Sequence, residues 1–275
     1  MSTTDFITEL FCRVDDVMRD VPKHSQASLH PSEVVTLALL FAIKGVGNRA
    51  FYRWVERDYL PLFPRLPERT RLFRLFATHQ EWSSRFMAEP TLLGVADTYG
   101  VELLHPWRYE RTPNQVGRKG FSNHKWIVGG KLCMQCMLCM LLNKWGLVVD
   151  WDCGTCATAN VHDSAFHAVI AQYEEQMIVL ADQLFSLKEG NPTNLLVCER
   201  GKWNSRMMVE TVLSMLHTIC HIKHMAHRVW VYFQARLAFT MAAFNLLAQW
   251  DGPAPAGLHP DEHGRVHLSI AQFSL

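Results

Sequence analysis

The hydrophobic pattern of this chain changes at Pro90, and that change constrains the fold more than any other feature of the sequence. Before Pro90, apolar residues such as Phe6, Leu10 and Val14 recur at spacings of three and four, which is typical of helices. After it, a cluster of strand-like apolar runs comes first, and further runs then alternate with helical patterns. We therefore expect an α/β fold, a mixed sheet flanked by helices with a helical N-terminal region in front of it.

The same pattern divides the chain into three parts. Residues 1–89 are expected to be helical, residues 90–250 to form the α/β core, and residues 251–275 to be a loosely ordered tail rich in Pro and Gly. Strands are predicted at 91–96, 126–142, 146–152, 177–181 and 194–198, and helices at 162–176, 203–224 and 227–250.

The N-terminal part is predicted to contain short helices joined at Gly or Pro turns. One helix, capped by Ser32, should end near Gly45 and Gly47, and a second should begin at Arg49. A third starts near Pro67 and carries three arginines: Arg69, Arg71 and Arg74. This arrangement fits a helix-turn-helix DNA-binding module or an ordinary bundle. The bundle is favoured because residues 1–89 hold 12 Lys and Arg against 11 Asp and Glu.

The overall charge identifies no partner, because 27 Lys and Arg stand against 26 Asp and Glu. Any electrostatic signal must therefore be local. The first residues carry acids where a signal peptide would carry bases. The longest apolar runs, 35–43 and 237–247, are shorter than the ~20 residues needed to cross a bilayer. We expect a cytoplasmic protein with no membrane partner.

Five of the eight cysteines are closely spaced in the strand-rich region: Cys133, Cys136, Cys139, Cys153 and Cys156. Counted from Cys136, their spacing is close to that of a zinc ribbon. The Met and Leu residues between them indicate a buried strand instead. Buried thiols are therefore the favoured interpretation, and metal binding is the alternative.

Two aspartates directly follow apolar, strand-like runs. Asp97 comes after the run at 91–96, and Asp182 comes after the run at 177–181. Carboxylates at the carboxyl ends of buried strands lie at the sheet edge where α/β sites form. A single Asp at a strand end can also be an ordinary turn residue. Asp152 and Asp163 are alternative acids for the second position.

The predicted helix over 203–224 makes a functional site the favoured interpretation of Asp97 and Asp182, rather than two ordinary turn residues. Steps of three and four align one face of it: Trp203, Arg206, Glu210, Ser214, His217, His221 and His224. Glu210 is the single acid between residues 200 and 236, among six Lys and Arg and four His. A second basic stretch at 107–131 has six Lys and Arg and one acid. A lone carboxylate in basic surroundings fits a metal site that faces a phosphodiester.

With these residues in place, the region from about 94 to 250 resembles the DDE transposases of bacterial insertion sequences, whose catalytic core is RNase H-like. That family carries Asp at the end of the first strand, Asp at the end of the fourth and Glu on a later helix, which correspond to Asp97, Asp182 and Glu210. Its signature around the glutamate is Tyr, two residues, Arg, three residues, Glu, six residues, Lys. Here the same spacing holds Trp203, Arg206, Glu210 and His217, so Tyr and Lys are replaced.

The resemblance implies a transposase that cleaves and joins DNA at insertion-sequence ends. Asp97, Asp182 and Glu210 would be the catalytic residues and would hold Mg²⁺ or Mn²⁺. The implied DNA contacts are Trp203, Arg206, His217, Lys119, Lys125, Arg69 and Arg71. The implied partners are terminal inverted repeats and target DNA, with a homodimer forming at synapsis. The setting would be the bacterial cytoplasm, at the nucleoid during the reaction.

Three further hypotheses remain open at this point. Glu199 is a substitute for the third acid, close behind Asp182 in the chain. The chain would also fit a metal-dependent nuclease that lacks transfer activity. The third hypothesis is an inactive derivative that binds DNA or serves as a zinc-stabilised structural protein.

Overall fold

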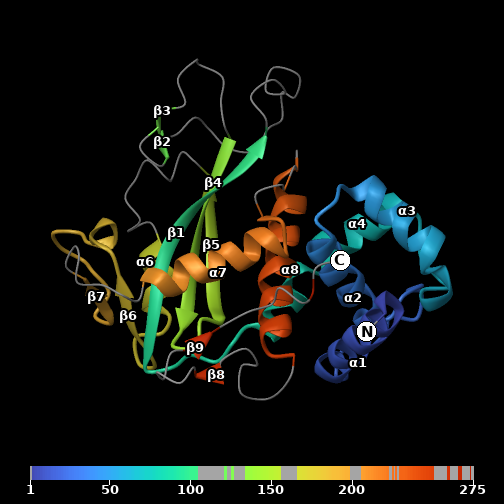
Figure 1. Cartoon of the computed structure of the whole chain (residues 1–275), viewed down its shortest axis with the longest axis horizontal. Coiled ribbons are helices and arrows are strands. Elements are labelled where there is room, and N and C mark those ends of the chain that lie inside the picture. Colours follow the sequence, from blue (N-terminus) through green and yellow to red (C-terminus); the bar gives the residue numbers. More distant parts are fainter. Residues whose placement is uncertain are drawn as a thin grey trace.

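The computed structural model describes residues 2–104, 121–122, 125–126, 134–155, 166–198, 206–222, 225, 227, 229–250, 259–260, 266–267 and 273. Figure 1 shows a strand-rich part at one end of the long axis and a helical part at the other, with α8 between them. The architecture is mixed α/β, as the sequence predicts.

The regular elements described within residues 2–89 are all helices, as expected, and loops connect them. It contains α1 (Thr3–Met18), α2 (Pro31–Lys44), α3 (Asn48–Asp58) and α4 (Arg69–Thr78), with 3₁₀ turns η1 (Leu60–Leu62) and η2 (Gln80–Phe86). The prediction that Ser32 caps α2 is wrong. The helix begins at Pro31 with His30 as its N-cap residue, and Glu33 accepts a hydrogen bond from the His30 amide at 2.6 Å. α2 ends where expected, at Gly45 with φ 64°.

The core sheet has five strands in the order β5-β4-β1-β6-β7. Their bounds are β1 (Leu93–Leu104), β4 (Met134–Asn143), β5 (Val148–Thr155), β6 (Ile178–Ala181) and β7 (Leu195–Val197). β1, β4 and β5 are antiparallel neighbours, whereas β6 and β7 run parallel to β1. Two short pairs lie outside this sheet, β2 (Phe121–Ser122) with β3 (Lys125–Trp126) and β8 (His259–Pro260) with β9 (Val266–His267).

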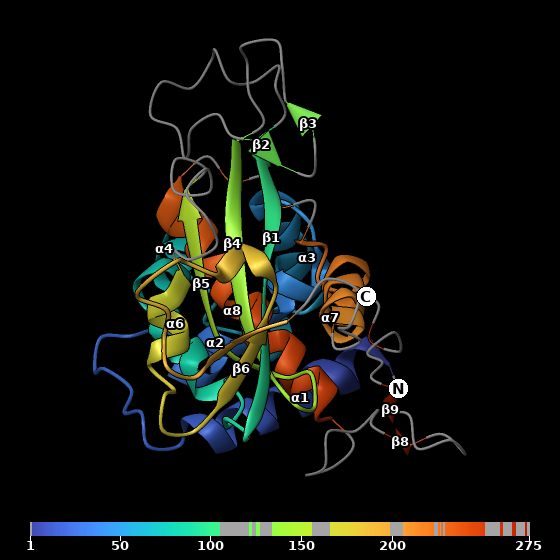
Figure 2. The ribbon, with the colours of Figure 1, turned by 90° about the vertical axis from the view of Figure 1, so that its left-hand side faces the viewer.

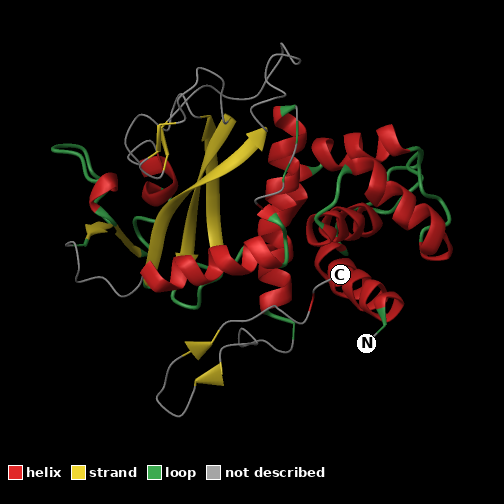
Figure 3. Cartoon of the chain, turned by 45° about the horizontal axis from the view of Figure 1, so that its top comes forward, coloured by secondary structure: helices red, strands yellow, loops and turns green. Residues whose placement is uncertain are grey.

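The two faces of this sheet belong to different apolar clusters. Ala96, Cys139 and Leu141 pack with Val169 and Ile170 of α6 (His167–Ala171) and its flanking residues. The opposite face packs against α7 (Arg206–Thr218) and α8 (Trp230–Ala248). Figure 3 shows α7 running across the strands. Figure 2, from the side, shows α7 next to β1 and apart from α6.

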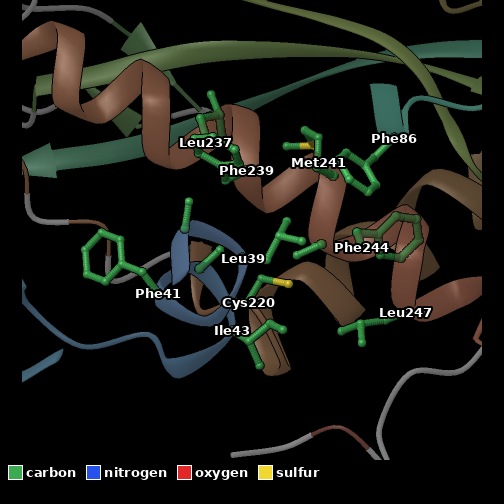
Figure 4. Packing of buried hydrophobic residues seen from close by; sticks show 14 of the residues in the cluster. Leu39, Phe41, Ile43, Phe86, Cys220, Leu237, Phe239, Met241, Phe244 and Leu247 are labelled. Carbon is green, nitrogen blue, oxygen red and sulfur yellow. The ribbon is translucent and has the colours of Figure 1, made fainter. Parts of the chain in front are cut away.

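α8 joins the helical region to the sheet. Its residues are apolar nearly all round, as expected for a helix that is buried on every side. Figure 4 shows Leu39 and Ile43 of α2 in one interior with Phe244 and Leu247 of α8 and with Cys220. The boundary near residue 89 therefore marks a change of secondary structure, while the apolar core continues across it.

The buried side-chain amide of Asn245 fixes the position of α8 against the sheet. Asn245 of α8 accepts a hydrogen bond from the Val148 amide at 2.8 Å and donates to the Val148 carbonyl at 2.7 Å. It also donates to the Phe86 carbonyl at 3.0 Å. The side chain is fully buried, so these three bonds satisfy a strand end and the last 3₁₀ turn where no water reaches.

The C-terminal residues are described only in part, and one of them is buried. Phe273 is 4% exposed, and its ring packs near that of Phe6, at 5.9 Å between centroids, and that of Trp250, at 5.2 Å. This side chain completes the core beside α1, and most of the predicted tail at 251–275 lies outside the described residues. Figure 1 shows the two chain ends on the same side of the molecule.

Among the described residues, no single helix is both long and apolar enough to cross a membrane. The pair α2 and α3 meets the length and composition test together, but the chain bends by 118° between them.

Candidate active site and nucleic-acid interface

Asp97 lies within β1, not at its end as predicted. The strand continues to Leu104 because its antiparallel ladder with β4 extends well past Asp97. The parallel ladder with β6, by contrast, ends at Val95 paired with Leu180. Asp97 is therefore just beyond the last parallel pair of the sheet. Its Oδ1 accepts a hydrogen bond from the Thr98 amide at 2.7 Å.

Asp182 follows β6 directly, as predicted. It has extended backbone angles, and its Oδ1 accepts a hydrogen bond from the Leu184 amide at 2.8 Å, which caps the next 3₁₀ turn. Asp97 and Asp182 each lie two residues beyond the last pair of the parallel ladder, Val95 with Leu180. Two aspartates far apart in the sequence thus follow the same end of that ladder.

That face is the one α7 covers. Side chains alternate along β1, so Asp97 shares a face with Val95 and Tyr99. The Tyr99 ring meets the His217 ring of α7 edge to face, with 5.0 Å between centroids. Glu210 lies two turns before His217 on the same helix and is exposed. Asp97 therefore lies on the face of β1 that α7 covers, and α7 also carries the exposed Glu210.

Within the described part of the chain, no three His, Cys, Asp or Glu side chains are gathered closely enough to hold a metal ion. Asp97, Asp182 and Glu210, all within the described part, therefore do not form a ligand cluster. Carboxylates that share a site repel one another without a cation between them. The donor set itself, three carboxylates, matches the oxygen ligands that Mg²⁺ prefers.

Asp152, which the sequence offered as a substitute for Asp182, is on the wrong face of the sheet. It pairs in register with Cys139, and Cys139 pairs with Thr98, so these three share one side. Cys139 belongs to the cluster around α6. Asp152 therefore faces away from Asp97. Asp163 and Glu199, the substitutes for the second and third acids, lie outside the described residues.

The helix predicted over 203–224 is shorter than expected. α7 ends at Thr218, and His221 has φ 52°, which is left-handed backbone. The His221 ring lies against Gly45, where an added Cβ would come within 2.1 Å of the ring. His221 therefore does not continue the predicted polar face. His217 is half-buried against Tyr99, so its role at DNA stays a prediction.

Several predicted DNA contacts cannot be placed. Trp203 and Lys119 lie outside the described residues, and Arg206 and Lys125 are described by their backbones, in α7 and β3. Arg236, one of the six basic residues counted around Glu210, is 4% exposed and lies in the core. It therefore does not belong to a phosphate-facing patch.

The described cysteines do not support a shared zinc site. Cys139 and Cys153 are both buried. They belong to opposite faces of the sheet, one in the cluster around α6 and the other in the cluster around α8. Buried thiols, the favoured interpretation, are confirmed for these two. The side chains of Cys133, Cys136 and Cys156 lie outside the described part.

The N-terminal region carries a basic surface. The count of charged residues over 1–89 did not reveal it. Residues 44–78 hold eight Lys and Arg against three Asp and Glu, whereas residues 1–43 hold three against six. Seven arginines of the first segment are exposed: Arg49, Arg53, Arg57, Arg65, Arg69, Arg71 and Arg74. We call these seven the arginine surface. The excess of acids in residues 1–43, which include α1, cancels the positive charge of the arginine surface in the total over residues 1–89. A charge count over residues 44–78 alone would have revealed it.

α3 carries part of the arginine surface in a regular stripe. Arg49, Arg53 and Arg57 are spaced by four and point outward, while Phe51 and Val55 are buried beneath. Arg57 also pairs with Asp58 at 2.7 Å. α2 and α3 are bent by 118° across residues 45–47, which include two glycines. Helix-turn-helix units join their helices at about 90–120° through turns of this length.

α4 continues the arginine surface. A shallow hollow on its outer side is lined by Glu68, Thr70, Arg71, Arg74, Leu75 and Thr78. Arginine and threonine side chains are common donors to phosphate oxygens. Figure 1 shows α3 at the end of the molecule opposite β6 and β7. The arginine surface and the aspartate pair are thus separate features.

The fold defines a mixed α/β protein with a five-stranded sheet and an aspartate pair at its centre. The chain matches no known family model, no curated protein and no solved structure at a significant level.

Proposed function

We propose that this chain is a DDE transposase with an RNase H-like core, which cleaves DNA at insertion-sequence ends and joins it to target DNA. The observation that carries the proposal is the parallel register of β1 and β6, in which Asp97 and Asp182 each lie two residues beyond the last pair, Val95 with Leu180. In the family that the sequence resembles, the two aspartates belong to the first and fourth strands. β1 and β6 are the first and fourth strands of this sheet in chain order.

The chemistry fits the residues of this layer. Two divalent ions bound by the three carboxylates would activate the attacking oxygen and stabilise the leaving oxygen of a phosphodiester. The Asp97 carboxylate is oriented by the Thr98 amide, and the Asp182 carboxylate by the Leu184 amide. Glu210 is exposed on α7 and would supply the third carboxylate from the opposite side of the layer.

The proposal includes DNA at the arginine surface. A helix-turn-helix unit presents its second helix to the major groove, and α3 is in that position after α2. Its arginines would contact phosphates and base edges, while Arg71 and Arg74 of α4 would contact the backbone nearby. A homodimer at synapsis and action at the nucleoid in a bacterial cytoplasm complete the proposal, as the resemblance implies.

Arg53→Ala and Arg71→Ala should each weaken binding to duplex DNA and lower the slope of log affinity against log salt by about one. Each substitution removes one phosphate contact from the arginine surface. The matched control is Arg19→Ala, which removes the same charge from exposed α1. Fluorescence anisotropy with labelled duplexes at several salt concentrations measures both quantities. Equal losses for all three variants would contradict a localised interface.

Strand joining tests the activity itself. The full chain with Mg²⁺ is mixed with linear duplexes taken from the DNA on either side of its coding sequence, together with a supercoiled plasmid as target. We expect cleaved ends that become covalently joined to the plasmid. Cleavage without joining would identify a nuclease that lacks transfer activity, and binding without cleavage would identify an inactive derivative.

A further inference from the structure

The guanidinium of Arg236 on α8 is a charged group buried in the apolar core. The side chain is 4% exposed and lies over the Phe41 ring, with 4.4 Å between Cζ and the ring centroid. One long hydrogen bond runs from Nη1 to the Val46 carbonyl, at 3.4 Å. Within the described part of the chain, Nε and Nη2 have no hydrogen-bond partner. Two strong donors are thus buried without an acceptor.

The charge of this group is also uncompensated by the residues around it. Burial lowers the pKa of Arg236 to about 10, which is still above neutral pH, so the guanidinium remains charged. Burial raises the pKa of the neighbouring Cys220 thiol to about 12, so it is neutral. No carboxylate among the described residues pairs with Arg236. Buried charges without a partner cost several kcal/mol.

A second orphaned polar group faces the same place. His227 is 7% exposed, and its Nε2 has no hydrogen-bond partner within the described residues. Burial, reinforced by the charge of Arg236, lowers the pKa of His227 to about 3, so the ring is neutral at ordinary pH. A neutral imidazole whose Nε2 carries the proton is a hydrogen-bond donor.

Both side chains line one small cavity between α2, α4 and α8. Its walls include the following residues: Phe41, Phe73, Phe76, Phe239, His227 and Arg236. The cavity is small and enclosed, and has room for a single monatomic ion or water molecule. The edges of aromatic rings carry partial positive charge. The cavity therefore suits one small particle that accepts hydrogen bonds and is negatively charged.

We propose that this cavity is a binding site for one small monovalent anion of the size of chloride, held by Arg236 and His227. A water molecule would satisfy the donors but would leave the guanidinium charge unbalanced. Phosphate and sulfate are too large for the space. The anion would connect α8 to α2 and α4, and so would fasten the helical region to the rest of the fold. The site is independent of the proposed DNA chemistry.

The test is the dependence of the melting temperature on chloride at constant ionic strength, with gluconate as the replacing anion. Because a ligand that binds only the folded state stabilises it, Tm should rise by about 2 to 3 °C for each tenfold increase of chloride above its Kd. Crystals soaked in bromide should show an anomalous peak between Arg236 and His227. A Tm that does not change with chloride would overturn the proposal. Electron density between Arg236 and His227 without an anomalous signal would also overturn it.

Variants separate this site from general salt effects. Arg236→Met keeps the length of the side chain and removes its charge, so the chloride dependence should disappear. Arg57→Met makes the same change on exposed α3 and should keep the wild-type dependence. If Arg236→Met does not fold, the wild-type titration and the bromide peak still decide the question. Loss of the chloride dependence in both variants would overturn the assignment to this cavity.

Discussion

Asp97→Asn, Asp182→Asn and Glu210→Gln should each reduce Mg²⁺-dependent cleavage of end DNA by about a hundredfold to a thousandfold or more. Each substitution removes a metal-binding charge with almost no change of volume. Metal ions supply several kcal/mol of charge stabilisation in phosphodiester chemistry, and each 1.36 kcal/mol corresponds to a factor of ten in rate. Binding of duplex DNA should change little, because the arginine surface lies on other elements. Gel assays of cleavage and anisotropy measurements of binding separate the two effects.

Asp152→Asn is the matched control for these three variants. It makes the same chemical change on the opposite face of the same sheet, at an exposed position on β5. Its cleavage rate should remain within about twofold of the wild type, since a surface substitution away from the site changes stability by ~0.5 kcal/mol or less. Near-normal cleavage by Asp97→Asn or Asp182→Asn would remove the aspartate pair from the mechanism.

Asn245→Ala should lower the free energy of unfolding by about 3 to 5 kcal/mol, the largest stability loss that we expect from one polar side chain. The change leaves the Val148 amide and the Phe86 carbonyl without their side-chain partner, whereas the Val148 carbonyl still accepts a hydrogen bond from the Ala88 amide at 2.9 Å. An orphaned buried polar group costs about 1–3 kcal/mol. Chemical denaturation followed by circular dichroism measures the loss.

Asn191→Ala is the control for that variant. Asn191 is exposed, and both its side-chain hydrogen bonds are to Leu187 nearby in the same loop. Its removal should cost less than about 1 kcal/mol. If the two variants lose similar stability, Asn245 does not join α8 to the sheet in the way described.

Local periodicity was sufficient to predict most elements of secondary structure. The helices of residues 1–89, the strands around Asp97 and Asp182, and α8 all occur close to their predicted positions. The errors lie where a distant segment decides a local conformation. β1 is longer than predicted because β4 pairs with it beyond Asp97. α7 is shorter because the chain turns at His221, against Gly45 of another helix.

The sequence by itself determined the α/β class, the change from helices to strands at Pro90 and the acids that merit a test. These follow from residue spacing and side-chain chemistry, which act over a few neighbouring positions. Only the tertiary structure decided that the parallel ladder of β1 and β6 ends just before Asp97 and Asp182, that Asp152 faces the other side, and that Arg236 is in the core rather than at a phosphate. Strand register and helix docking depend on contacts between segments tens of residues apart, and periodicity within one segment carries no information about which partner it meets.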